Sequence, residues 1–173
     1  NIIYFEISAR CGSFPVVAVS VSDGCGAKTG RLGKNGCEIF TREFDSPGLK
    51  ISSAVATCQK ELCDREADGI KTKRFALAVV TSFDSPDYIE KSLYLAEAAD
   101  YDSAKAATQN NWQGFFAQSD ATLSDKELEL FYHEGLYLLA CCTGNRRFPP
   151  GLFGNFVTND DAPWHSDYHL NYN

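Results

Sequence analysis

The residues best suited to chemistry lie in the last 23 positions of the chain, from Gly151 to Asn173. This segment holds five aromatic residues, two of the three histidines, three aspartates and four asparagines, without any lysine or arginine. Aromatic faces cover the apolar C–H surface of a sugar ring, while carboxylate, amide and imidazole groups bond its hydroxyls. Because the segment carries no cation, its composition disfavours a phosphate or carboxylate ligand and favours a carbohydrate.

Three other chemistries fit this segment less well. His165, Asp167 and His169 could hold a metal ion, but their spacing without helical period fixes no geometry, so no metal is expected. A carboxylate pair for glycoside cleavage could come from Asp160, Asp161 or Asp167, although Asp160 and Asp161, adjacent acids after an asparagine, are more typical of a turn. The G-x-S-x-G pattern of a serine nucleophile does not occur in the sequence.

A glycine-rich stretch from Asp23 to Gly36 invites interpretation as a phosphate loop, which its spacing excludes. The Gly-Lys-Ser/Thr triplet of a P-loop is missing, because Ala27 separates Gly26 from Lys28. Clustered glycines more commonly serve turns that need positive φ angles. We therefore expect a hairpin loop between strands here, and no cofactor.

The seven cysteines show no metal-binding or redox spacing. The sequence contains no C-x-x-C motif, and an odd count leaves at least one thiol without a partner in the chain. Cys58 and Cys63 could pair or remain thiols. Adjacent Cys141 and Cys142 lie in a strongly helical stretch and are best interpreted as small apolar core residues.

The composition is that of an acidic globular protein. The net charge is −7, the sequence pI is about 4.9 and 44% of residues are hydrophobic. An acidic chain is a poor candidate for binding nucleic acid or a basic membrane-surface role. No apolar run reaches the roughly 18 residues of a membrane-spanning helix. We expect neither a nucleic-acid partner nor a membrane partner.

Strand-like patterns fill the first half of the chain. Short runs rich in valine, isoleucine, phenylalanine and threonine alternate with turn residues, which predicts strands. These runs are Ile2 to Ile7, Phe14 to Val21, Cys37 to Phe40, Leu49 to Thr57 and Phe75 to Thr81.

Helical periodicity begins at about residue 84. Asp84-Ser85-Pro86 predicts the start of a first helix, and a second is expected from about Ser103 to Gln118. A capping box of Ser124 and Glu127 predicts a third. That third helix is apolar around more than half of its circumference, so we expect it to have neighbours on two sides.

Three motifs between Leu128 and Asn173 occur together in one known family. They are Gly135-Leu-Tyr137-Leu-Leu139 at the end of a helix, Pro150-Gly-Leu-Phe-Gly154 after Arg146 and Arg147, and Pro163-Trp-His-Ser-Asp167-Tyr-His169-Leu-Asn171-Tyr-Asn173. In this order the motifs resemble the early catalytic domain of glycoside hydrolase family 95, the α-L-fucosidase type, and its relatives.

The resemblance implies an inverting glycoside hydrolase. Asn171 and Asn173 would be catalytic, holding and helping to activate the attacking water. The sugar subsite would be lined by His169, Trp164, Asp167 and Tyr168. The acid and base carboxylates would come from later helices, so the chain is expected to be a fragment of a longer protein.

The resemblance also implies a fold and a location. The expected fold class is α+β by segments, with a β-sandwich portion, then linker helices, then the first helices of a truncated (α/α)6 barrel. The expected domains are residues 1–83 for the partial sandwich, 84–108 for the linker and 109–173 for the partial catalytic domain. An extracellular or periplasmic location is expected from the family alone.

One departure from the family bears on specificity. Where the family commonly has Leu-Gln-Gly-x-Trp-Asn, this chain has Leu152-Phe-Gly-Asn-Phe156-Val157. The sugar could therefore be α-L-fucose or that of a less characterised branch of the superfamily. A second hypothesis is a non-catalytic carbohydrate-binding or scaffold protein of the same architecture.

Overall fold

The structure is a computed structural model that describes residues 2–10, 14, 19–46, 51–119, 121–143, 150–151 and 154. The chain divides into two compact units, Asn1–Asn111 and Trp112–Asn173, and the division falls within helix α2 (Tyr101–Phe116). A β-sheet and one complete helix belong to the first unit, whereas helix α3 (Lys126–Thr143) belongs to the second.

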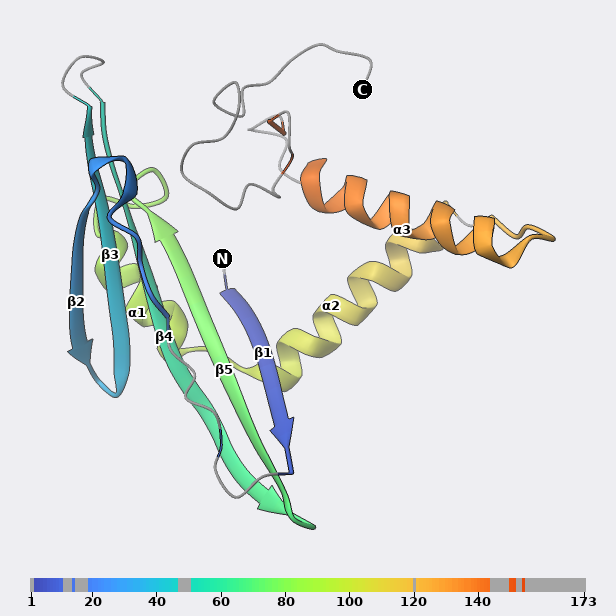
Figure 1. Cartoon of the computed structure of the whole chain (residues 1–173), viewed down its shortest axis with the longest axis horizontal. Helices are drawn as coiled ribbons and strands as arrows, with labels where there is room; N and C mark the ends of the chain where they lie inside the picture. Colours follow the sequence, from blue (N-terminus) through green and yellow to red (C-terminus); the bar gives the residue numbers. More distant parts are fainter. Residues whose placement is uncertain are drawn as a thin grey trace. The chain divides into compact units, whose positions relative to one another are not determined.

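Five strands form one antiparallel sheet in the first unit (Figure 1). They are β1 (Ile2–Ala9), β2 (Lys28–Lys34), β3 (Cys37–Ser46), β4 (Ile51–Ala67) and β5 (Ile70–Thr81). The strand order is β1-β5-β4-β3-β2. Strands β2 to β5 thus follow one another as a meander, while β1 pairs with β5 at the opposite edge.

The expected fold class is wrong. The sheet forms one layer rather than part of a sandwich, and the described residues contain three helices but no portion of a helical barrel. Strand-like runs predict strands but do not predict how many sheets they form. Helix α1 (Tyr88–Glu97) covers the face that a second sheet would have covered. The expected domain boundaries remain a prediction.

Four of the expected strands are confirmed as β1, β3, β4 and β5, but β4 and β5 are longer than their apolar runs. Strand β4 continues for 17 residues and β5 for 12. Their extension is charged, and Lys73 Nζ lies 2.7 Å from Glu61 Oε2 and 3.0 Å from Asp64 Oδ2. Cross-strand ion pairs replace apolar contacts there. Of the expected strand Phe14–Val21, residues 15–18 lie outside the described residues, and the described positions 14 and 19–21 are not in a strand.

The glycine-rich stretch contains a strand, so the expected hairpin loop is wrong over β2. Gly30 lies opposite Thr41 on β3, and a Cβ atom at Gly30 would lie 2.6 Å from Thr41 Oγ1. Contact with the Thr41 side chain on the neighbouring strand, rather than a loop, therefore favours glycine at this position.

Two tight turns connect the hairpins of the meander. Asn35-Gly36 joins β2 to β3 and Asp68-Gly69 joins β4 to β5, with positive φ angles at all four residues. Turns of this kind have a backbone twist that matches the twist of the flanking strands.

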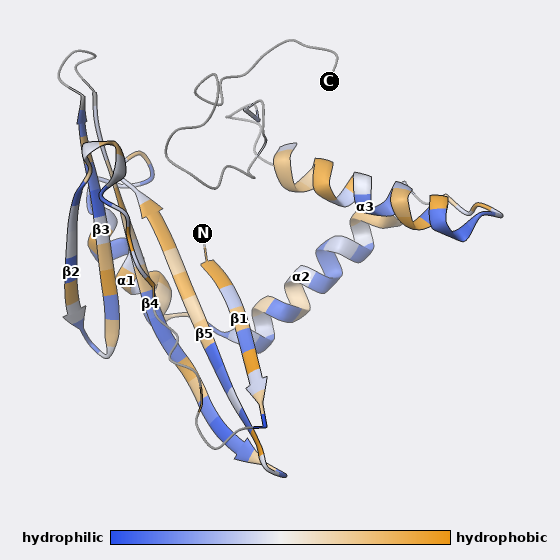
Figure 2. Ribbon diagram, in the orientation of Figure 1, coloured by the Kyte–Doolittle hydropathy of each residue, from blue (hydrophilic) through white to orange (hydrophobic). Residues whose placement is uncertain are grey.

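The core of the first unit lies between α1 and one face of the sheet, here called the α1 face. Its buried residues are Cys37, Ile39, Ala56, Cys58, Ala78, Leu93 and Ala96. Alanine at three of these positions lets the helix approach the strands closely. Figure 2 shows the matching pattern on β5, which is hydrophobic towards its C-terminal end and hydrophilic near its start. The buried residues of α1 are Ser92, Leu93 and Ala96.

The start of α1 differs from the expected cap. The N-cap residue is Asp87, whose side chain makes no capping hydrogen bond. Asp84 instead accepts hydrogen bonds from the Thr81 N–H at 2.9 Å and the Thr81 hydroxyl at 2.8 Å. These bonds lower the pKa of Asp84. The Asp84 carboxylate therefore stabilises the turn between β5 and α1 and does not cap the helix.

Aromatic contacts join the helices of the second unit. Trp112 packs against Tyr137 with ring centroids 4.7 Å apart, and Phe116 packs against His133 at 5.8 Å. The opposite side of α3 is exposed, including 74% of Phe131 and 59% of Leu139. The third expected helix is confirmed as α3. Asp125, rather than Ser124, accepts hydrogen bonds from its first N–H groups.

Candidate functional site

The predicted carbohydrate site lies outside the described residues. This applies to all six positions: Asn171, Asn173, His169, Trp164, Asp167 and Tyr168. Their roles remain a prediction from sequence. Two polar features stand out among the described residues, both in the first unit.

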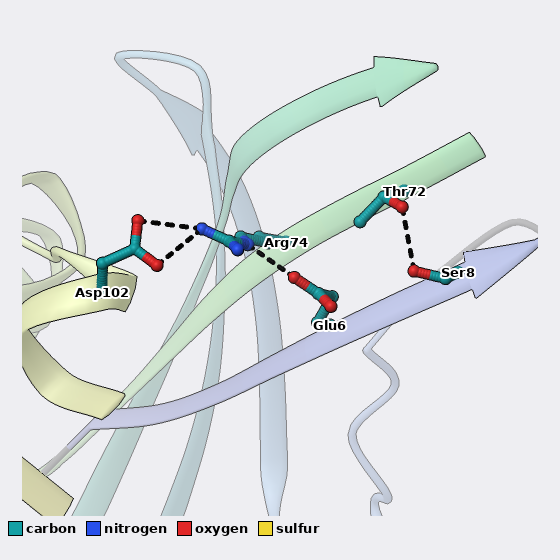
Figure 3. Close-up of polar contacts among 5 residues, drawn as sticks. All are labelled: Glu6, Ser8, Thr72, Arg74 and Asp102. Atoms are coloured by element: carbon teal, nitrogen blue, oxygen red, sulfur yellow. Dashed lines mark hydrogen bonds and ion pairs between the residues drawn. The ribbon is translucent and has the colours of Figure 1, made fainter. Parts of the chain in front are cut away.

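The first feature is a charged cluster around Arg74 of β5 (Figure 3). Arg74 Nε donates to Glu6 Oε2 of β1 at 2.6 Å, and its Nη1 lies 2.9 and 3.0 Å from the two Asp102 oxygens. The guanidinium also lies 4.2 Å from the ring centroid of Tyr101. Next to this cluster, Ser8 and Thr72 share a 2.9 Å hydrogen bond between β1 and β5.

The Arg74 cluster is built for structure rather than for catalysis. Its guanidinium is engaged by two carboxylates and a ring, and only 17% of the side chain is exposed. The hydrogen bond to Glu6 is the main cause that raises the pKa of Arg74 above its ordinary value. Because the guanidinium is paired with two carboxylates, its charge is largely neutralised and it is a poor site for an anionic ligand. It therefore holds the first turn of α2 against the sheet.

The second feature is a polar cavity of about 440 Å³ where the α1 face extends past the start of α1. We call it the strand-end basin and define it by six of its lining residues: Lys28, Glu43, Asp45, Ser52, Ser82 and Tyr88. The strand register places the first four on the same face, because Lys28 is opposite Glu43 and Asp45 is opposite Ser52. Four neighbouring strand ends and one helix thus contribute to it.

Hydrogen bonds hold the basin in shape. The Tyr88 hydroxyl donates to Glu43 Oε1 at 3.1 Å, and burial, followed by the Glu43 carboxylate, raises the pKa of Tyr88. The hydroxyl therefore stays protonated at neutral pH. Ser82 extends the ladder beyond β5, since its N–H donates to the Ala54 carbonyl at 2.8 Å and its Oγ accepts from the Ala54 N–H at 3.0 Å.

The core thiols do not form a reactive site. Cys37 and Cys58 are buried under α1, and burial, with the adjacent Cys37 thiol, raises the pKa of Cys58 to about 12. Because the thiolate is the nucleophile, Cys58 is inert at neutral pH. Cys58 and Cys63 are both free thiols, which decides the pairing that the sequence left open.

Neither a metal-ligand cluster nor a membrane-spanning helix occurs in the described ranges. Across these ranges, no three side chains of the His, Cys, Asp and Glu types are grouped so that they could hold a metal ion. None of the helices described here has the length and apolar character needed to cross a membrane.

Sequence reasoning missed the strand-end basin, although a signal for it exists. The α1-face positions of β3 are Cys37, Ile39, Thr41, Glu43 and Asp45, which change from apolar to acidic along one face. Such a change along one face of a strand indicates where the element that covers this face ends.

Comparisons with protein-family models, with curated proteins and with solved structures found no match to this chain.

Proposed function

We propose that the chain is part of a glycoside hydrolase that cleaves by inversion, acting on an α-L-fucoside or a related sugar. The observation that carries this proposal is the run Pro163-Trp-His-Ser-Asp167-Tyr-His169-Leu-Asn171-Tyr-Asn173. It combines an indole, imidazoles, a carboxylate and two amides within eleven residues. Few ligands other than sugars need both a flat apolar surface and this many directional polar groups.

Each group in the run has a chemical role under this proposal. The carboxamides of Asn171 and Asn173 orient the attacking water, since an amide both donates and accepts hydrogen bonds. Trp164 covers one apolar face of the sugar, while His169 and Asp167 bond its hydroxyls, with Tyr168 at the edge of the subsite. Inversion also needs an acid and a base, two carboxyl groups separated widely enough to admit a water.

The order of elements along the chain supports the proposal. Helix α3, which carries Gly135-Leu-Tyr137-Leu-Leu139, ends at Thr143 and precedes the run. The resembling enzymes have the same order of helix, short arginine-containing turn and sugar-binding run. The single-layer sheet does not enter this argument.

Hydrolysis of aryl glycosides tests the proposal on the complete protein encoded by the gene. The substrates are 4-nitrophenyl α-L-fucoside and the matching galactosides and glucosides, with NMR of the released sugar to identify the first anomer formed. We expect release of the inverted anomer, and a drop in kcat of about a hundredfold or more in both Asn171→Ala and Asn173→Ala. Asn110→Ala, which removes an exposed amide on α2, is the matched control.

Wild-type rates in both amide variants would contradict the roles given to Asn171 and Asn173. The second function, non-catalytic carbohydrate binding, is favoured by the strand-end basin, which offers hydroxyl and carboxylate groups to a ligand without a nucleophile. Saturable sugar binding by the complete protein without hydrolysis of any of these glycosides would select it.

A further inference from the structure

The strand-end basin is a place where the α1 face changes character. Under α1 the face is apolar, with Ile39, Ala56 and Ala78 buried. Past the start of the helix the same alternation continues with Glu43 and Asp45, although the backbone ladder is unbroken. The result is a hollow of about 440 Å³ with a polar floor of strand residues and Tyr88 on its border.

We propose that the strand-end basin binds a neutral saccharide of one or two units, with residues other than those of the Pro163–Asn173 run. The choice of a sugar rests in part on the proposed function, but the basin and its residues do not. A volume of this size lies within the range of small-ligand sites, roughly 300–1,000 Å³.

The charges in the basin point to a neutral ligand. One lysine, Lys28, lies opposite one carboxylate, Glu43, and a second carboxylate, Asp45, lies two residues further along the strand. A phosphorylated or carboxylated ligand would meet two carboxylates and a single ammonium group. A strongly cationic ligand would face the two carboxylates but also the ammonium group of Lys28. A neutral polyhydroxyl compound meets donors and acceptors of both kinds without net repulsion.

The remaining groups suit a sugar in detail. Tyr88 is half-buried, its hydroxyl is fixed by Glu43 at 3.1 Å, and its ring borders the cavity, so it can cover a sugar C–H face without losing much side-chain freedom. Carboxylates accept strong hydrogen bonds from sugar hydroxyls, and the hydroxyls of Ser52 and Ser82 add weaker ones. This set resembles a binding site more than a catalytic one, because it lacks an activated nucleophile.

The test uses two-dimensional 1H–15N NMR of the full chain, titrated with the methyl glycosides of L-fucose, D-galactose and D-glucose, with lactose, and separately with inorganic phosphate. We expect at least one sugar to bind saturably and to shift amides of Glu43, Asp45, Ser82 and Tyr88. The double variant Glu43→Gln with Asp45→Asn weakens that binding about tenfold or more, since charged acceptors become neutral amides.

The matched control is Glu38→Gln, a carboxylate on the same strand but on the opposite face. It leaves sugar affinity unchanged, and Tyr88→Phe weakens binding less than the double variant because it keeps the ring. The proposal is overturned if no sugar binds saturably, if the shifted amides lie outside the basin, if Glu38→Gln weakens binding as much as the double variant, or if phosphate binds in place of sugars.

Failure here is separable from failure of the proposed hydrolysis. Asn171→Ala and Asn173→Ala lower turnover but leave sugar binding in the basin intact, whereas the double variant weakens sugar binding in the basin and leaves hydrolysis of a simple aryl glycoside intact.

Discussion

Arg74 on β5 and Asp102 on α2 form an ion pair in which one guanidinium nitrogen reaches both carboxylate oxygens, at 2.9 and 3.0 Å. The two residues come from elements separated by α1 along the chain. Because Arg74 also binds Glu6 of β1 and stacks on Tyr101, one side chain connects the edge strand, its neighbour and the first turn of α2. This connection depends on a planar cation with several donors, a property that lysine lacks.

Replacing Arg74 tests this role. We expect Arg74→Lys to lower the free energy of unfolding by about 1–2 kcal/mol, because only one of the three contacts can be kept. Urea unfolding followed by circular dichroism measures the change. The control is Arg31→Lys, whose pair with Glu38 is far more exposed and should change stability by less than about 0.5 kcal/mol. Equal losses in both variants would refute a special role for Arg74.

Gly30 and Thr41 provide a test of close strand packing. A methyl group at Gly30 would overlap Thr41 Oγ1, so Gly30→Ala should destabilise the sheet by roughly 1–3 kcal/mol. Thr41→Ala removes the overlapping atom, and the double variant should recover part of the loss. A double-mutant cycle of unfolding free energies measures the coupling. Strictly additive effects would mean that the two positions do not meet.

The strands and helices were largely predictable because their signals are local. Runs of β-branched and aromatic residues marked four strands, and three-to-four spacing marked all three helices. The number of layers was not predictable, because it depends on which element covers a face. Leu93 and Ala96 are as consistent with a linker helix as with the helix that covers the sheet.

The two candidate sites also differ in how far the sequence predicts them. The run that ends at Asn173 is recognisable from residue types alone, because aromatic and amide residues are concentrated in it. The strand-end basin is assembled from positions such as Lys28, Ser52 and Tyr88, which are far apart in the sequence. Only the strand register brings them together, and the register of β2 with β3 depends on the turn that Asn35-Gly36 sets locally.

Asp84 should make stability depend on acidic pH. Its hydrogen bonds from the Thr81 N–H and hydroxyl lower its pKa in the folded state, so the carboxylate favours folding when it is charged. This contribution is present above about pH 4, the ordinary range of an aspartate, and is lost as pH falls through the lower folded-state pKa. Asp84→Asn should cost roughly 1 kcal/mol at pH 7 and flatten the stability profile below pH 4.

The control for that experiment is Asp87→Asn, three residues later, where the side chain makes no capping hydrogen bond. Unfolding free energies of both variants at pH 7 and at about pH 3 separate the two positions. A profile for Asp84→Asn that runs parallel to that of the unaltered chain would exclude the proposed contribution.

Cys58 should make stability depend on alkaline pH, in the opposite direction. Burial and the nearby Cys37 thiol raise its pKa to about 12, from an ordinary thiol value of about 9. A group whose pKa is raised on folding stabilises the folded chain below its unfolded pKa, and this contribution is lost as pH rises from about 9 to about 12.

Comparing unfolding free energies of the unaltered chain and Cys58→Ala at pH 8 and at about pH 10.5 isolates this effect from lysines and tyrosines common to both. We expect the unaltered chain to lose more stability over this interval than Cys58→Ala does. Equal losses would show that the thiol does not ionise more easily on unfolding.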